Sequence, residues 1–160
     1  MPTDIRRTTL PEILSRTVAA VSEQEAYVGP GERITWTQLA AQARRSAAAL
    51  HAAGVRKGDH VGVMLGNSGT WIATFLGAAS LGAVTVPVNT RFKADELLYC
   101  LRQADVRLLV IADAFLGIDF VDLLRAAEPA IDTTLPGNAL PKLKRVVVVG
   151  DGPVPQGCQG

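Results

Sequence analysis

Cysteine and histidine are scarce in this chain, with two of each among 160 residues. Cys100 and Cys158 are too few and too far apart for a zinc site or a disulfide framework. His51 and His60 stand outside any cluster with metal-ligand or catalytic spacing, so we expect structural roles for both. No secretory signal is recognisable, and a reducing cytoplasm is the expected compartment.

An excess of charge of either sign is also missing, because 16 basic and 15 acidic side chains leave a formal net charge of +1. That balance gives no electrostatic argument for binding nucleic acid or an anionic membrane. The local basic cluster of Lys142, Lys144 and Arg145 leads into an apolar run and is typical of a solvated loop.

Formal charge is absent altogether between Asp59 and Arg91, where the sequence reads HVGVMLGNSGTWIATFLGAASLGAVTVPVNT. Such a stretch must be covered on several sides, because burying an unpaired charge is costly and burying an apolar side chain is favourable. Its pattern predicts a buried strand at 60–65, a helix from about 68 to 81 and a second strand at 84–88. The helix would span roughly 20 Å against about 30 Å of membrane hydrocarbon, which argues against a transmembrane segment.

The rest of the chain alternates in the same way. We expect a polar, loosely held terminus at 1–9, helices at 11–21, 37–53, 92–101 and 120–127, a hairpin at 26–36, strands at 106–111 and 146–149, and a loop at 131–141. This alternation predicts an α/β fold: an open, mostly parallel sheet with helices on both faces, preceded by a small β-hairpin. Residues 1–150 would form one domain, followed by a flexible Gly/Pro tail at 151–160.

The glycines of the uncharged stretch do not form a known phosphate-binding motif. Gly62, Gly66 and Gly69 are spaced G-x-x-x-G-x-x-G, whereas dinucleotide sites have G-x-G-x-x-G and an acidic residue after the next strand. No glycine is followed by Lys and then Ser or Thr, so a P-loop is absent from the sequence. Binding of a small anion by the free backbone amides at the helix start near Ser68 stays an open alternative.

The order of motifs resembles a known family. Gly58-Asp59 precedes the first central strand, Leu65 to Ser68 open the helix, and Leu81-Gly82-Ala83-Val84 lead to Pro87, Asn89 and Arg91, while KLKRVVVVG lies farther along the chain. From about Leu10 to Gly150 this resembles the N-terminal subdomain of AMP-forming acyl-CoA ligases of the fatty-acid or aryl-CoA synthetase type, in the adenylate-forming superfamily.

The resemblance implies a ligase that uses ATP to convert a small-molecule carboxylic acid into an acyl-adenylate, then transfers the acyl group to CoA and releases AMP and pyrophosphate. ATP, CoA and magnesium are the implied cofactors of the complete enzyme. The resemblance also places the ATP-phosphate loop, the magnesium-binding acid and the C-terminal lysine domain later than this chain reaches. We therefore expect no catalytic or metal-binding residue here, and an inactive chain when it is alone.

One functional residue is implied by the resemblance. Arg91 stands where several acyl-CoA-forming members place an arginine near the phosphates of the CoA nucleotide. The alternative is that Arg91 only brackets the helix beginning near Lys93, a position where the family frequently has Ser or Thr. Both interpretations stay open.

Two other classes of function compete with the ligase. The chain is also consistent with a non-catalytic α/β interaction module that self-associates or complements another fragment, because the four valines of 146–149 would leave apolar surface at an interrupted sheet. A nicotinamide-dependent oxidoreductase is the weakest alternative, since its glycine fingerprint is missing.

Overall fold

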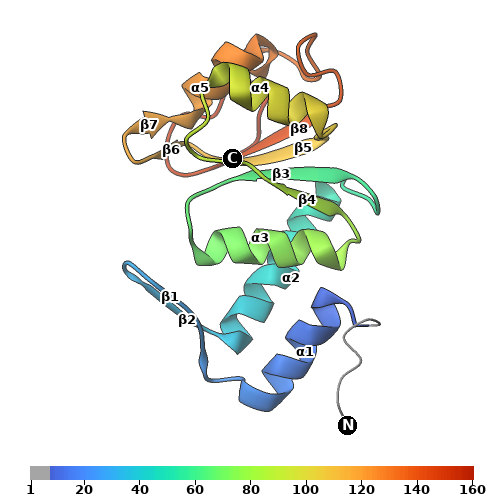
Figure 1. The fold of residues 1–160 in the computed structure, drawn as a ribbon, viewed down its shortest axis with the longest axis vertical. Helices are drawn as coiled ribbons and strands as arrows, with labels where there is room; N and C mark the ends of the chain where they lie inside the picture. The colour runs from blue at the N-terminus through green and yellow to red at the C-terminus, as the bar shows by residue number, and fades with distance from the viewer. Residues whose placement is uncertain (1–7) are drawn as a thin grey trace.

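A four-stranded parallel sheet forms the centre of the computed structural model, which describes residues 8–160 (Figure 1). Its strands are β3 (His60–Met64), β4 (Val84–Pro87), β5 (Leu108–Ala112) and β8 (Arg145–Val149). They lie in the order β4-β3-β5-β8, and each neighbouring pair is parallel. The predicted α/β class and parallel sheet are confirmed. Most of the expected loose terminus lies outside the described residues.

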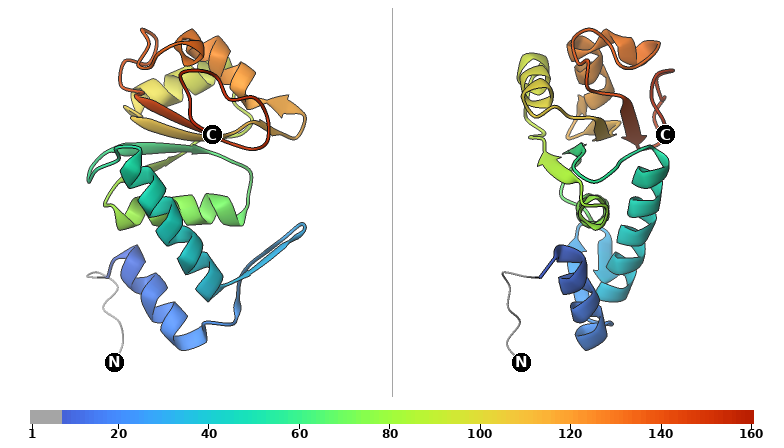
Figure 2. Two further views of the ribbon diagram at one scale, coloured as in Figure 1. Left: turned by 180° about the vertical axis from the view of Figure 1, so that it is seen from behind. Right: turned by 90° about the vertical axis from the view of Figure 1, so that its right-hand side faces the viewer.

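Helices cover both faces of this sheet, as the sequence predicts. Helices α2 (Trp36–Ala52) and α3 (Gly69–Ser80) lie on one face, and α4 (Ala94–Gln103) and α5 (Phe120–Ala127) lie on the other (Figure 2). Helix α1 (Leu10–Val21) packs against α2 and α3 on the side away from the sheet. In the part of the chain that is described, no helix is long and apolar enough to cross a membrane.

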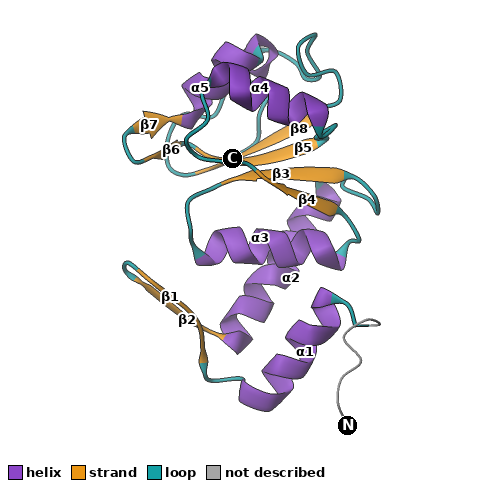
Figure 3. Ribbon diagram, viewed as in Figure 1, coloured by secondary structure: helices purple, strands orange, loops and turns teal. Residues whose placement is uncertain are grey.

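The predicted hairpin precedes the sheet and consists of β1 (Glu25–Gly29) and β2 (Glu32–Thr35), paired antiparallel (Figure 3). The capping box at the start of α2 is present, because Thr35 Oγ1 accepts a bond from the Gln38 amide and Gln38 Oε1 accepts one from the Thr35 amide. The chain therefore turns directly from β2 into α2.

Three local features differ from the expectation. The second strand of the uncharged stretch, β4, is less buried than its lack of charge suggests. Val84 is 47% exposed, because β4 lies at the edge of the sheet. A small antiparallel pair, β6 (Ala114–Phe115) and β7 (Ile118–Asp119), follows β5 and was not predicted. The expected loop after α5 begins with a 3₁₀ turn, η2 (Pro129–Asp132).

The Gly/Pro-rich segment 151–160 returns to the sheet. The Val148 amide donates to the carbonyl of Gln159 at 2.7 Å, and the Gln159 amide donates to the carbonyl of Val146 at 2.9 Å. The domain boundary at residue 150 and the flexibility of this segment stay predictions, but its last residues are hydrogen-bonded to β8.

Candidate functional site

The carboxyl ends of the parallel strands form the edge of the sheet at which α/β proteins bind ligands. From β3 the chain crosses to β4 on one side and then returns to β5 on the other side of β3. The switch point therefore lies between the ends of β3 and β5. The loops that follow β3, β4 and β5 all emerge at this edge, and they carry the candidate residues.

Arg91 lies in the loop that follows β4. Its backbone amide donates to Asn89 Oδ1 at 2.9 Å, which closes a tight turn immediately after the strand. The Arg91 side chain is exposed and takes part in no salt bridge among the described residues. Its guanidinium is therefore accessible to an anion from solution.

Lys93 precedes α4 and does not provide a side-chain cap. Instead, Glu96 Oε2 accepts a hydrogen bond from the Lys93 amide at 2.9 Å. The helix start is thus held by Glu96, and Arg91 makes no hydrogen bond that would bracket it. Both interpretations of Arg91, a contact with CoA and a bracket for this helix, stay predictions.

The turn between β3 and α3 is fixed by the N-terminal hairpin. Ser68 Oγ accepts from the Trp71 amide at 3.2 Å and donates to the carbonyl of Gly66 at 3.1 Å. Glu32 of β2 places its Oε2 atom 3.1 Å from the Gly69 amide, which donates to it. A carboxylate of the chain itself thus lies at the positive end of α3, where the sequence left open an external anion. The anion site at this helix start stays a prediction, with the Gly69 and Trp71 amides already donating to acceptors within the chain.

Asp113 and Phe115 follow β5 and were not recognised from the sequence. Asp113 accepts hydrogen bonds from the amides of Ala114 at 2.7 Å and Gly152 at 2.9 Å, which hold the pKa of its carboxyl below the ordinary value. Phe115 covers Gly66, where an added Cβ would lie 2.3 Å from the ring. The aromatic side chain therefore occupies the switch point itself, and its partner glycine lies 49 positions earlier in the sequence.

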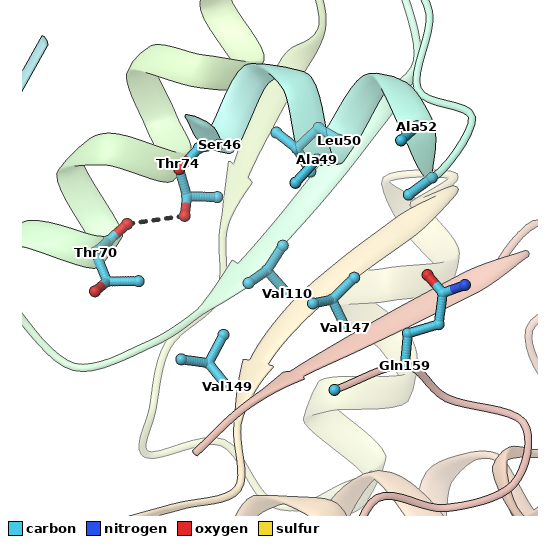
Figure 4. A pocket seen from close by; sticks show the side chains of 12 residues that line it. Ser46, Ala49, Leu50, Ala52, Thr70, Thr74, Val110, Val147, Val149 and Gln159 are labelled. Atoms are coloured by element: carbon cyan, nitrogen blue, oxygen red, sulfur yellow. Dashed lines mark hydrogen bonds between the residues drawn. The ribbon is translucent and has the colours of Figure 1, made fainter. Parts of the chain in front are cut away.

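A hollow lies between α2 and the sheet and extends to Val149 at the end of β8 and Thr70 at the start of α3 (Figure 4). It has a volume of about 390 Å³. Its walls are formed by residues of α2 and α3, by Val110, Val147 and Val149 of the sheet, and by Gln159 and Gly160. None of its lining side chains carries a charge, so they offer no counterion to a carboxylate or a phosphate.

The cysteines and histidines do not form a reactive centre in the described part of the chain. Burial raises the pKa of the Cys100 thiol, and it raises that of Cys158 to about 11, so neither is a ready thiolate. His60 Nδ1 lies 2.5 Å from the carbonyl oxygen of Ala104, which is a structural contact. No group of three or more His, Cys, Asp or Glu side chains is placed to hold a metal in residues 8–160.

Comparisons with known proteins connect the chain to one family. Residues 14–158 match the family described as AMP-binding enzyme. A methyl-dioxo-octahydroindenyl-propanoyl:CoA ligase of Rhodococcus jostii (strain RHA1) is 38% identical over 143 residues, covering 89% of this chain and 26% of that enzyme. The human mitochondrial medium-chain acyl-CoA ligase ACSF2 is 32% identical over 153 residues, covering 92% of this chain and 25% of the relative.

A solved structure agrees with these relatives. The anthranilate CoA ligase AuaEII, crystallised with anthranoyl-AMP, superimposes with a TM-score of 0.81 at 29% identity, covering 96% of this chain and 27% of that one. The chain spans about a quarter of the length of the curated relatives it matches, and the match lies in their N-terminal part.

Proposed function

Because the chain belongs to the AMP-binding enzyme family, we propose that it acts as the N-terminal part of an ATP-dependent acyl-CoA ligase. The observation that carries this proposal is the match over residues 14–158 to relatives named as acyl-CoA ligases, at up to 38% identity over most of the chain. In the complete enzyme a small carboxylic acid attacks ATP, forming an acyl-adenylate and pyrophosphate. The thiol of CoA then attacks the acyl carbonyl, and AMP leaves.

In this proposal the described residues contribute a scaffold to the reaction. They include neither a glycine-rich triphosphate loop with its lysine nor a metal-binding cluster. Magnesium is accordingly expected to bind residues of the complete enzyme outside this part. The cytoplasm stays the predicted compartment, and one relative is named as mitochondrial.

The purified 160-residue chain is therefore expected to catalyse no acid-dependent exchange of pyrophosphate into ATP. The physical reason is that acyl-adenylate formation requires charge stabilisation on the triphosphate, which these residues do not supply. The measurement is incorporation of labelled pyrophosphate into ATP in the presence of medium-chain and aromatic acids. Exchange above the acid-free control would contradict the inactivity of the chain.

For Arg91 we propose the role that the resemblance implies, a contact with a phosphate of the CoA nucleotide. Support comes from the exposed, unpaired guanidinium and from the Asn89 turn that fixes its backbone at the carboxyl edge of the sheet. A charge-assisted hydrogen bond to phosphate contributes about 1.5–3 kcal/mol. Binding by this chain alone is therefore weak, and a site-resolved method is needed to detect it.

Adding CoA to the isotopically labelled chain is expected to shift the amide resonances of residues 89–92. Arg91→Ala should weaken this binding about tenfold or more, because it removes the charged donor. Arg44→Ala, which removes an exposed arginine from α2, is the matched control and should leave the titration unchanged. Equal titrations of the wild-type and Arg91→Ala chains would overturn the CoA role and leave Arg91 without a ligand.

Self-association through β8 is a second proposal, and a specific observation favours it. The α2-facing side of β8 carries Val147 and Val149, which line the uncharged hollow and are only partly buried. Apolar surface beside a sheet edge is a common site of association.

A further inference from the structure

The amino edge of the parallel sheet, opposite the edge that carries Arg91, contains a hollow of about 490 Å³ that we call the basic hollow. It lies where the turn after α2 meets the first residues of β5 and β8. Three cationic side chains line it, those of Arg107, Lys144 and Arg145, and no acidic side chain of the described residues does. A five-residue strand spans about 16 Å, at about 3.3 Å per residue, so this hollow and the carboxyl edge are separate sites.

Backbone hydrogen bonds fix the positions of these cations. The Arg107 amide donates to the carbonyl of His60 at 2.9 Å. The Arg107 carbonyl in turn accepts from the amides of Lys144 at 2.8 Å and Arg145 at 3.3 Å. The three cationic residues thus lie side by side at the start of two neighbouring strands. Their backbone is set by the sheet itself, so binding an anion requires little ordering of the chain.

The positive charge of the basic hollow is only partly balanced. Arg107 Nε lies 3.3 Å from Asp59 Oδ2, but the Arg107 side chain is still 40% exposed. Asp59 and Asp105 line a neighbouring hollow that shares Arg107 and Lys144. Lys144 and Arg145 are exposed and take part in no salt bridge among the described residues. Two cations of the basic hollow are therefore free to pair with a ligand.

The carboxyl end of α2 reaches the basic hollow, and the partial negative charge of its last carbonyls would repel an anion. Arg56 reduces this repulsion, because its Nη1 donates to the carbonyls of His51 at 3.0 Å and Val55 at 2.9 Å. Val55 lines the hollow, so Arg56 adds a further positive charge next to it. The balance of charge around the hollow thus favours an anion.

The other walls of the basic hollow are largely apolar, with Ala53, Leu135 and Pro136 among the lining residues. Leu135 packs against the core on the α4 and α5 side of the sheet. The loop that carries it is anchored by the buried Glu128, which accepts from the Leu140 amide at 2.7 Å. A ligand that fills the hollow should therefore have an apolar part beside its anionic group.

We propose that the basic hollow binds a small organic phosphate, that is, a phosphate ester carried on an apolar or aromatic group. A phosphate monoester has about two negative charges at neutral pH, which matches the two unpaired cations Lys144 and Arg145. Arginine and lysine both bind phosphate, and the apolar group would lie against Leu135 and Pro136. This site is independent of the ligase proposal and of the CoA contact proposed for Arg91.

Titrating the isotopically labelled chain with phenyl phosphate tests the proposal. At about 0.05 M ionic strength and about pH 7.5, the amide resonances of residues 53–55, 107–108 and 144–145 are expected to shift with one common dissociation constant. Shifts at these residues separate this site from the CoA titration, which is followed at residues 89–92. The absence of any shift at these residues up to about 20 mM ligand would overturn the site.

A double variant removes the unpaired charges. Lys144→Gln combined with Arg145→Gln should weaken phenyl phosphate binding about tenfold or more, because the backbone bonds stay while both charged donors are lost. The matched control is Arg44→Gln combined with Arg45→Gln, which removes two charges from the exposed face of α2 and should leave binding unchanged. Equal dissociation constants for wild type and the Lys144→Gln, Arg145→Gln chain would refute the role of these cations.

Folding of the variants is checked through hydrogen exchange of the Leu109 amide in β5, which should stay as protected as in wild type. If the double variant does not fold, Lys144→Gln alone replaces it. The single variant should weaken phenyl phosphate binding about threefold or more, because one of the two unpaired charges remains. An unchanged dissociation constant in that chain would count against the site in the same way.

Two further ligands separate the parts of phenyl phosphate. Inorganic phosphate lacks the ring, and benzoate has the ring with a single negative charge, so each should bind about threefold or more weakly than phenyl phosphate. Leu135→Ala should reduce the advantage of phenyl phosphate over inorganic phosphate, since it shortens the apolar wall. Inorganic phosphate binding as tightly as phenyl phosphate would overturn the assignment to an organic ligand. Benzoate binding as tightly would overturn the assignment to a phosphate.

Discussion

Replacing Gly77 with valine is expected to lower the free energy of unfolding by about 3–4 kcal/mol, because it forces apart the helices α2 and α3. Gly77 lies in the middle of α3, against the backbone of α2. A Cβ placed there would lie 2.8 Å from the Ala47 nitrogen and 3.1 Å from the Ala43 oxygen. Backbone atoms cannot rotate away as a flexible side chain can, so one helix must move.

The consequences would extend across one face of the sheet. Helices α2 and α3 bury Leu50 and Ala78 against β3 and β5, and separating the helices disturbs that packing. Urea denaturation at low protein concentration measures the change in the free energy of unfolding, from the urea concentration at the midpoint and the slope of the free energy with urea. Gly77→Ala adds the same Cβ and should also destabilise the chain, by about 1 kcal/mol less than valine, because alanine has no further methyl groups and a better helix propensity. Ser80→Val, at an exposed position of α3, controls for a β-branched residue in this helix. Equal stabilities of Gly77→Val and Ser80→Val would contradict the close helix contact.

Replacing Glu128 with alanine is expected to destabilise the chain by about 3–5 kcal/mol. Glu128 follows α5 and is only 2% exposed. Its Oε2 accepts from the Leu140 amide at 2.7 Å, and its Oε1 accepts from the Ala130 amide at 3.2 Å. Removing the carboxylate leaves both amides without their acceptor and empties the space around which residues 130–140 fold.

Glu128→Gln is the informative comparison. Glutamine has the same shape but only one acceptor oxygen, so one of the two amides would face an NH₂ group. We expect an intermediate loss of about 1–2 kcal/mol. The melting temperatures of the variants, measured at one pH, give their relative stabilities. Hydrogen exchange of the Leu140 backbone amide reports on the loop itself. If Glu128→Ala matched wild type and kept that amide protected, the carboxylate would not organise this loop.

The strands and helices were largely predictable because each is encoded by its own residues. The uncharged stretch predicted β3, α3 and β4 in sequence, and Ser68 caps α3 as its position suggested. The valine run predicted β8 within one residue, and helix α5 was predicted at its observed bounds. Periodicity and capping act over a few residues, so a single sequence reveals them.

The candidate site was predictable only in part. Arg91 was reached through the resemblance, and the structure places it at the carboxyl edge of the sheet with a free guanidinium; its ligand stays a prediction. The contact between Glu32 and the start of α3 could not be predicted. Glu32 lies 37 positions before Gly69, whose backbone amide donates to it. Phe115 over Gly66 was missed for the same reason.

The sequence by itself determined the α/β class, the order of the elements and the resemblance to acyl-CoA ligases, since all three follow from local patterns read in order. Only the tertiary structure decided that β4 is an exposed edge, that Glu128 is a buried acceptor and that residues 157–160 cover β8. Those features depend on which strands become neighbours and which segments meet across tens of residues. Local propensity does not specify such pairings, because they are selected by the packing of the whole chain.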